Sequence, residues 1–459
     1  MTERKPDALE VRAREMCVNR GIDPDSRVPK PVTSDEASLD GMWKTWPAWC
    51  QYREKAREER NLVARIAASD HAALTVQPAE YQNAPLTIFG EAEDQTVQQM
   101  KNCMSYGNVV AGVLCADNHL GYSQPVGGVI AYENQISISG VGYDIACGNK
   151  AVRLDVQYKD IKANTAQLLE DIRANISFGV GQINATPVEH PIFDEDDQWQ
   201  YAGMLDYKKK AQGQLGTVGS GNHYVDLFYD EQGWVWIGIH FGSRGLGHTI
   251  ATRGVKLAGG KDGIHAVPSL VDVDSEIGRQ YLAGMDLAGQ YAYAGRNWVV
   301  ERVRQMIGGS VTAEVHNHHN YAWLEEHNGR KLWVVRKGAT PAFPGQFGFV
   351  GGSMAENAVI IKGIDSDVAA DSLYSTVHGA GRVMGRQQAK RTFRAEQMQE
   401  WLRTAGVQLS GGGLDESPMA YKRLGEVLDY HKGAIQIVHN LKPFAVAMAG
   451  SSDFDPWKD

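Results

Sequence analysis

Residues 140–156 read GVGYDIACGNKAVRLDV, a glycine-rich turn followed by strand-forming residues. Asp144 and Cys147 lie three positions apart between glycines, where the backbone can approach a ligand closely. The run at 151–156 has the short apolar pattern of a β-strand. A carboxylate and a thiolate in such a turn suit a transition metal better than a purely structural role, so this stretch is the first candidate site.

The sequence on both sides of this turn predicts a mixed α/β fold. Strands are expected at 109–114, 129–132, 151–156, 234–240, 332–335 and 358–362. Helices are expected at 94–106, 162–174, 270–306 and 394–405. These elements do not alternate regularly, and no internal repeat is present. The pattern therefore favours neither a barrel nor a doubly wound sheet.

The chain divides by composition into three parts. Residues 1–82 are rich in charge and are expected to form an N-terminal helical extension, with an amphipathic helix at 52–68. Residues 83–450 contain no clear linker and are expected to form one catalytic domain. Residues 451–459 are polar and are expected to be a flexible tail.

Bulk composition is typical of a soluble protein. Of the 459 residues, 43% are hydrophobic and 22% are charged, and the five cysteines form no disulfide-like pattern. No secretory signal or membrane span is expected, so a cytoplasmic location is predicted. A net charge of −9 argues against a protein that coats nucleic acid, but it allows a local basic groove for one RNA end.

Four further segments carry polar residues suited to a metal or phosphate site. They are GSGNHYVD at 219–226, IHFGSRGLG at 239–247, VHNHHNY at 315–321 and HGAGR at 378–382. A thiolate, a carboxylate and several imidazoles suit a divalent transition metal, and ligand type alone favours Zn over Mn. At least one imidazole between His316 and His319 is expected to support ligands or face solvent.

Basic residues follow the last of these segments at intervals of four. They are Arg382, Arg386, Lys390 and Arg394, counted from His378. If the chain after Gly381 is helical, they form one stripe, whose usual fate is a solvated face. A glycine-rich turn can bind phosphate through its backbone, and histidine can attack phosphorus as a covalent nucleophile.

Eight segments resemble, in the same order, the motifs of the RtcB RNA-splicing ligases. They are GVGYDIACG, GSGNHYVD, HFGSRGLG, HHNY, RKGAT, GGSMA, HGAGR and DESPMAYK, and DNHLGY at 117–122 resembles an earlier motif. The resemblance extends from about Leu86 to Gly450. It implies a single catalytic domain with mixed β-sheets around a central metal cleft, outside which the N-terminal extension lies.

The resemblance also implies an activity and its cofactors. Such a ligase joins an RNA 3′-phosphate or 2′,3′-cyclic phosphate to a 5′-hydroxyl, in tRNA splicing or RNA repair, using GTP and two Mn²⁺ ions. Its implied partners are RNA, most often tRNA, and an archease-like activating protein. The nucleotide would be carried on His378 as a histidine–GMP intermediate.

The same resemblance assigns residues to roles. Cys147 would bridge two metals, with His223 and His240 completing one site and Asp144 and His319 the other. Asn222 and Arg382 would hold phosphates. The nucleotide would be cradled by Asp226, Ser353, Gly379, Ala380, Gly381 and Tyr421.

Three departures from the family pattern leave alternatives open. Asp226 stands where the family usually has Glu, and residues 447–450, AMAG, lack the usual lysine. Gly351 replaces a proline. Because Asp is shorter than Glu and the lysine is absent, one alternative is a divergent family member that uses another nucleotide or acts on another polynucleotide. The ligand set alone also permits a metal-dependent phosphoesterase, and a catalytically inactive RNA-binding protein is the remaining alternative.

Overall fold

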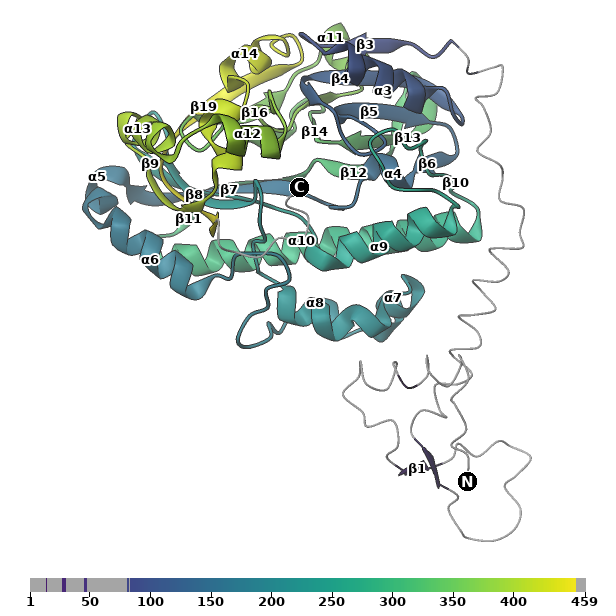
Figure 1. Ribbon diagram of the computed structural model, residues 1–459, viewed down its shortest axis with the longest axis horizontal. Helices are drawn as coiled ribbons and strands as arrows, with labels where there is room; N and C mark the ends of the chain where they lie inside the picture. Colours follow the sequence, from purple (N-terminus) through teal and green to yellow (C-terminus); the bar gives the residue numbers. More distant parts are fainter. Residues whose placement is uncertain (1–13, 15–26, 30–44, 48–80, 82, 451–459) are drawn as a thin grey trace.

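The computed structural model describes residues 83–450, together with Arg14, residues 27–29 and 45–47, and Tyr81 (Figure 1). Strands β1 (Arg27–Pro29) and β2 (Thr45–Pro47) pair with each other. The predicted helix at 52–68 and the predicted tail at 451–459 lie outside the described residues. The three-part division of the chain therefore stays a prediction.

The larger sheet has eight strands and supplies much of the site. Its order is β11-β7-β9-β8-β19-β16-β15, and β18 pairs with β19 in the sheet's one parallel pairing among the described strands. The bounds are β7 (Gly148–Gln157), β8 (Tyr224–Tyr229), β9 (Trp234–Phe241), β11 (Val311–His318), β15 (Phe347–Val350), β16 (Ala358–Gly363), β18 (Gln408–Gly412) and β19 (Ile435–Gly450).

A second sheet of five strands has the order β12-β13-β5-β4-β3. Its strands are β3 (Leu86–Ile88), β4 (Val109–His119), β5 (Val126–Tyr132), β12 (Asn320–His327) and β13 (Arg330–Lys337). Two small ladders join β6 (Gln135–Ser137) to β10 (Leu270–Asp272) and β14 (Ala339–Pro341) to β17 (Ser375–Val377). β11 leads directly into β12, so the HNHHN segment passes from one sheet to the other.

The long helix α10 (Glu276–Ile307) lies beneath the larger sheet beside α9 (Arg244–Leu257) (Figure 1). Ser275 caps its start by accepting a hydrogen bond from the Gly278 N–H at 3.0 Å, and Gly308 ends it at a φ of +87°. Small residues on its buried face allow close packing: a Cβ at Gly295 would lie 3.3 Å from the Phe241 ring. The helix thus forms a rigid base for the strand ends above it.

The remaining helices lie around this core, and α7 and α8 pack against α10 and α9 on the side away from the sheets (Figure 1). The α-helices are α3 (Asp94–Met104), α4 (Ile138–Val141), α5 (Tyr158–Ile161), α6 (Thr165–Asn175), α7 (Asp196–Tyr201), α8 (Lys208–Gln214), α11 (Asp367–Asp371), α12 (Arg386–Thr392), α13 (Ala395–Ala405) and α14 (Leu424–Asp429). Among the described residues, no helix combines the length and apolar character needed to cross a bilayer.

The mixed α/β prediction is confirmed, with two corrections. The predicted helix at 270–306 begins as strand β10, and α10 starts only at Glu276. The prediction that four basic residues form one stripe on a helix is wrong, because α12 begins at Arg386 and ends at Thr392. Arg382 lies in the loop before it and Arg394 caps the next helix, so the four basic residues share no helix face.

Candidate functional site

One cavity of about 1060 Å³ gathers residues from both sheets and from the loops that follow them. All residues proposed from the sequence as metal ligands line it: Asp144, Cys147, His223, His240 and His319. So do His378 and the residues proposed to hold the nucleotide: Asn222, Asp226, Ser353, Gly379, Ala380, Gly381, Arg382 and Tyr421. Folding therefore brings together segments up to 277 positions apart, from Asp144 to Tyr421.

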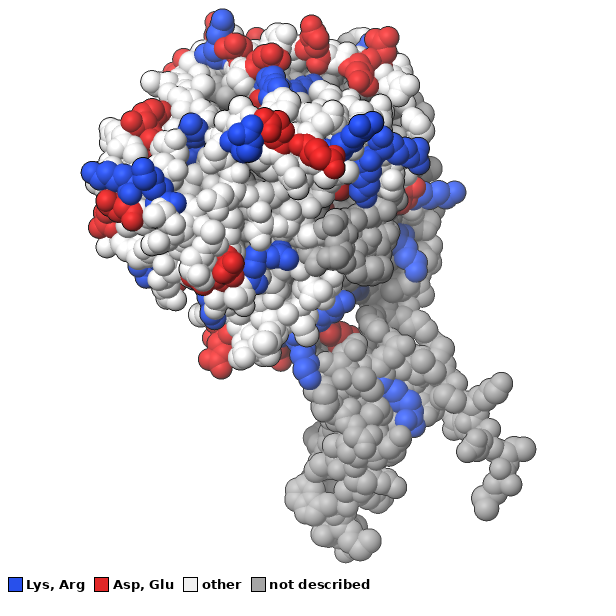
Figure 2. All heavy atoms as spheres, turned by 60° about the vertical axis from the view of Figure 1, so that its left-hand side comes forward, with Lys and Arg blue, Asp and Glu red and all other residues white. Residues whose placement is uncertain are grey.

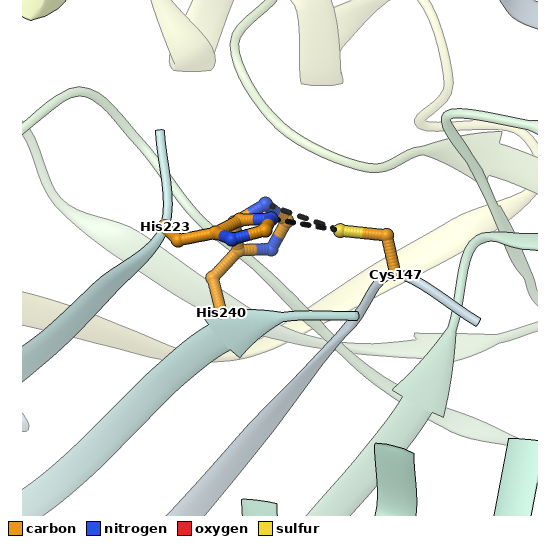
Figure 3. Close-up of side chains that lie close together, drawn as sticks. All are labelled: Cys147, His223 and His240. Carbon is orange, nitrogen blue, oxygen red and sulfur yellow. Dashed lines mark hydrogen bonds between the residues drawn. The ribbon is translucent and has the colours of Figure 1, made fainter. Parts of the chain in front are cut away.

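The donor atoms of Cys147, His223 and His240 lie within 4.8 Å of one another. The Sγ of Cys147 is 3.6 Å from the Nε2 of each histidine, and Figure 3 shows both rings directed at the sulfur. Cys147 lies just before β7, and His240 lies near the end of the adjacent strand β9. All three side chains are buried, as expected for a closed metal site rather than a surface cluster.

The ring of His240 is held in one tautomer. Its Nδ1 lies 2.7 Å from the Oδ1 of Asn149, whose own Nδ2 donates to the Phe349 carbonyl at 2.8 Å. Since that amide oxygen can only accept, His240 carries its proton on Nδ1 and turns a bare Nε2 toward Cys147. This outer hydrogen bond is the arrangement that orients imidazole ligands in metal sites.

Asp144 and His319 extend the cluster on opposite sides. The Oδ2 of Asp144 is 3.0 Å from His223 Nε2, whereas the rings of His319 and His240 lie 5.2 Å apart. The rings of His223 and His240 lie 5.3 Å apart, so these distances do not divide the cluster into two sets, and the assignment of ligands to two metals stays a prediction. His319 Nδ1 is buried and has no hydrogen-bond partner among the described residues. Because buried polar atoms normally have a partner, this nitrogen is suited to bind a metal ion.

The loop that carries Cys147 is strained and braced from below. Ala146 has a φ of +60°, a conformation that costs a residue with a Cβ about 1 kcal/mol or more. The buried guanidinium of Arg296, on α10, donates to the carbonyls of Ala146 at 3.1 Å and Phe241 at 2.6 Å. It also contacts His316 and His318, neither of which lines the cavity. These two imidazoles therefore support the loop instead of facing the cluster.

Burial changes the pKa of four of the donors in different directions. It lowers the pKa of His240 and of His319 well below the usual value, so both rings are neutral and able to act as ligands. Burial, aided by Asp144, raises the pKa of the Cys147 thiol well above its usual value. Burial also opposes ionisation of Asp144, but the hydrogen bond and charge of His223 prevail and lower the pKa of that carboxyl.

His378 lies beside this cluster and is oriented by Asp117. Its ring centroid is 4.8 Å from that of His319. The fully buried Oδ2 of Asp117 accepts from His378 Nδ1 at 2.6 Å and from the His378 backbone N–H at 3.0 Å. Burial alone would raise the pKa of Asp117, but the contacts with His378 outweigh this effect and lower it. Asp117 is therefore a carboxylate. The proton of His378 thus sits on Nδ1, leaving Nε2 bare as a nucleophile requires.

The hydrogen-bonding groups of the loop after His378 already contact protein atoms, although the resemblance implied that they hold the nucleotide. The Gly379 N–H points to Asp117 Oδ2 at 3.4 Å, so it is directed at the carboxylate and not at a phosphate. Arg382 donates to Glu416 at 3.3 Å and to the hydroxyl of Tyr421 at 3.0 Å, and its guanidinium lies over the Tyr421 ring. A phosphate would have to compete with Glu416 for Arg382.

Asp226 lies at the opposite wall, on β8. Its Cα pairs with Val446 of β19, and its Oδ1 is buried without a partner among the described residues. Burial raises its pKa well above the usual value, because only the Ala447 backbone opposes the effect. Burial therefore favours the neutral carboxyl, which offers one donor and one acceptor.

Charge on the outer surface is mixed. On the face in Figure 2, lysines and arginines alternate with acidic residues around a broad area of uncharged side chains. This agrees with the expectation that the protein does not bind nucleic acid through bulk charge. Basic side chains also line the cavity, but Lys337 and Lys422 donate to backbone carbonyls and Arg386 pairs with Asp415 and Glu416.

A protein-family model described as "tRNA-splicing ligase RtcB" matches residues 99–449. This range covers more than half of the chain and includes every residue of the predicted site. The chain belongs to the RtcB family. The resemblance seen in the sequence is thereby confirmed.

Curated relatives agree with this membership. The "RNA-splicing ligase RtcB" of Escherichia coli (strain K12) is 28% identical over 403 residues, which cover 79% of this chain and 96% of the relative. The "tRNA-splicing ligase RtcB" of Archaeoglobus fulgidus is 32% identical, covering 77% of this chain and 91% of the relative. That of Thermococcus kodakarensis is 29% identical with the same coverage.

Several residues that shape this RtcB-family site were missed in the sequence. Asn149 orients His240, Arg296 braces the Cys147 loop, and Glu416 pairs with Arg382. Asp117 lies in the quoted DNHLGY segment, but its contact with His378 spans 261 positions. The available signal was the place of Asp117 and Glu416 within family-like motifs, Glu416 being the second residue of DESPMAYK, whereas nothing local distinguishes Asn149 and Arg296 from ordinary polar residues.

Proposed function

We propose that this chain is an RNA ligase that joins RNA ends through a nucleotide carried covalently on His378. One observation carries the proposal: His378, with its Nδ1 held by Asp117, lines the same cavity as the Asp144–Cys147–His223–His240–His319 donor cluster, and its ring lies 4.8 Å from that of His319. The ligases named among its relatives support RNA as the substrate. The ends joined are a 3′-phosphate or 2′,3′-cyclic phosphate and a 5′-hydroxyl.

The donor cluster fits two divalent cations, proposed to be Mn²⁺. Cys147, His223 and His240 would hold one ion, and Cys147, Asp144 and His319 would hold the other. Such ions neutralise phosphate charge and polarise phosphorus toward attack. Asn149 and the Val218 carbonyl keep the His240 and His223 rings turned inward whether or not an ion is bound.

The chemistry assigned to this chain's own residues begins at His378. Its Nε2 attacks the α-phosphorus of a nucleoside triphosphate, a nitrogen–phosphorus bond forms, and the bond to pyrophosphate breaks. Asp117 keeps the Nδ1 proton in place and stabilises the positive charge that develops on the ring. The nucleotidyl group then passes to the RNA 3′-phosphate, which the 5′-hydroxyl attacks with release of the nucleoside monophosphate.

A single-stranded RNA end suits this cavity better than a duplex does. Tyr122 is 46% exposed and Ile264 is 43% exposed, and both line the cavity. They offer apolar surface on which an unpaired base can stack, an interaction worth about 1–3 kcal/mol per base. Split or damaged tRNA fits this description, and an archease-like activator and a cytoplasmic location remain predictions.

Intact-protein mass spectrometry tests the proposal most directly. After incubation with Mn²⁺ and each of the four nucleoside triphosphates in turn, the protein should gain one nucleoside monophosphate. The bond should be acid-labile and stable to alkali, as expected of a phosphoramidate. His378→Ala should abolish the adduct, whereas Asp160→Asn, on the exposed part of α5, should not change it. Hydrolysis of RNA phosphoesters without any adduct would favour a metal-dependent phosphoesterase.

The nucleotide itself is proposed to be GTP, with one observation favouring a broader choice. Burial raises the pKa of Asp226 and favours its neutral form, and the residues paired with this part of β8 on β19 are apolar, from Val446 to Met448. A neutral carboxyl pairs with a base edge that has one donor and one acceptor, and this does not select guanine strongly. Comparable adducts from ATP and GTP would support the broader choice, and an adduct from GTP alone would exclude it.

A further inference from the structure

His119 is an imidazole in the cavity to which no role has been given. It is the last residue of β4, it is partly buried, and it lines the cavity together with His378. Its Nδ1 lies 3.1 Å from the backbone carbonyl of Asp117. Because a carbonyl oxygen can only accept, Nδ1 carries the hydrogen and a neutral ring leaves Nε2 bare.

Asp117 therefore anchors two imidazoles through two different atoms. Its carboxylate holds His378, and its main-chain carbonyl holds His119. Burial lowers the pKa of His119 to about 4, more than the hydrogen bond to the Asp117 carbonyl and the charge of the Asp117 carboxylate raise it. His119 is thus neutral at physiological pH and has no acidic side chain as its hydrogen-bond partner.

The surroundings of His119 limit what its Nε2 can bind. On the other side of its strand, Lys422 donates to the carbonyls of Ala116 at 2.9 Å and Asn118 at 3.0 Å. Lysine and arginine side chains in this cavity can donate to phosphate oxygens, but a bare imidazole nitrogen cannot. Of the two RNA ends to be joined, the 5′-hydroxyl can donate a hydrogen bond to this nitrogen and must lose its proton in the reaction.

We propose that His119 is a catalytic base that accepts the proton of the RNA 5′-hydroxyl during joining, an inference that rests on the proposed function. The 5′-oxygen forms a bond to the phosphorus of the activated 3′-phosphate. The bond from that phosphorus to the oxygen of the nucleoside monophosphate breaks, and the electron pair leaves with that oxygen. The hydroxyl proton moves to His119 Nε2 and then to water.

The joining step can be measured apart from the nucleotide steps. Full-length protein with Mn²⁺ is given an RNA whose 3′-end already carries the nucleotide through a pyrophosphate link, together with a 5′-hydroxyl RNA. In His119→Gln and His119→Ala the joining rate should fall about 100-fold or more, the usual range for removal of a general base. Formation of the His378 adduct from nucleoside triphosphate should be unchanged. His439→Gln, on β19 and outside the cavity lining, is the matched control.

The pH profile separates a base from a merely structural residue. Wild-type joining should be nearly independent of pH between about pH 6 and 9, while the variants should become faster as hydroxide increases. Added imidazole should partly rescue His119→Ala. Joining at the wild-type rate in both variants, or an equal loss of joining and adduct formation, would overturn the assignment. A wild-type protein that forms no adduct and joins no RNA would instead overturn the proposed function, and this inference with it.

Discussion

At the residue scale, Asp117 fixes the geometry of the proposed nucleophile. Its Oδ2 accepts from the His378 ring, and asparagine can present either an oxygen or an N–H there but not a charge. In Asp117→Asn the rate of His378 adduct formation should fall about 100-fold or more, with little change in nucleotide affinity. Intact mass measured against time at saturating nucleotide gives this rate. An unchanged rate would mean that the carboxylate only packs against the ring.

Asp226 gives a second prediction at this scale, concerning stability. Because burial raises its pKa, the folded protein holds a proton that the unfolded chain releases above about pH 4. The stabilisation is complete below that pH and is lost as pH rises toward the folded pKa. Asp226→Asn does not titrate, so its melting temperature relative to wild type should increase between about pH 5 and 8. If the difference in melting temperature between Asp226→Asn and wild type did not change with pH, the raised pKa of Asp226 would be contradicted.

At the element scale, α10 supports the strained loop through Arg296. Arg296→Met would leave the carbonyls of Ala146 and Phe241 without donors, at a cost of about 3 kcal/mol or more. Urea unfolding should show this loss, and calorimetric titration should show weaker binding of Mn²⁺. Arg302→Met, exposed on the same helix, is the control and should change neither quantity. Full metal affinity in Arg296→Met would show that the loop holds its shape alone.

The elements that the sequence predicted are those with a strong local pattern. All six predicted strands coincide with observed ones, since runs such as that in β9 are apolar and bounded by turns. β19 was missed, because its first half is largely exposed and mixes apolar with polar residues without regular alternation, and its register shifts where it crosses the sheet. The residues of the site could be proposed from motifs. Their outer partners Asn149 and Arg296 could not, since those contacts arise only from tertiary packing.

At the scale of the whole molecule, the described residues that line the cavity all lie between Glu91 and Met448. A chain that starts at Asn83 should therefore form the His378 adduct at the same rate as the full-length protein, and should melt in one cooperative transition. Intact mass and calorimetry check these two results. Loss of the adduct on removal of residues 1–82 would assign the N-terminal extension a part in the site and would overturn the predicted domain boundary.

The order of strands in the larger sheet also affects how the protein is made. β19 is the last described strand to leave the ribosome, yet it lies between β8 and β16 and also pairs with β18. Until it arrives, two central strands have open edges, which can pair with other chains. A chain terminated before β19 would thus be prone to aggregation and would lack the part of the cavity lining that β19 supplies. The larger sheet is complete only after β19 has inserted between β8 and β16, so a chain that lacks β19 should not form the functional site.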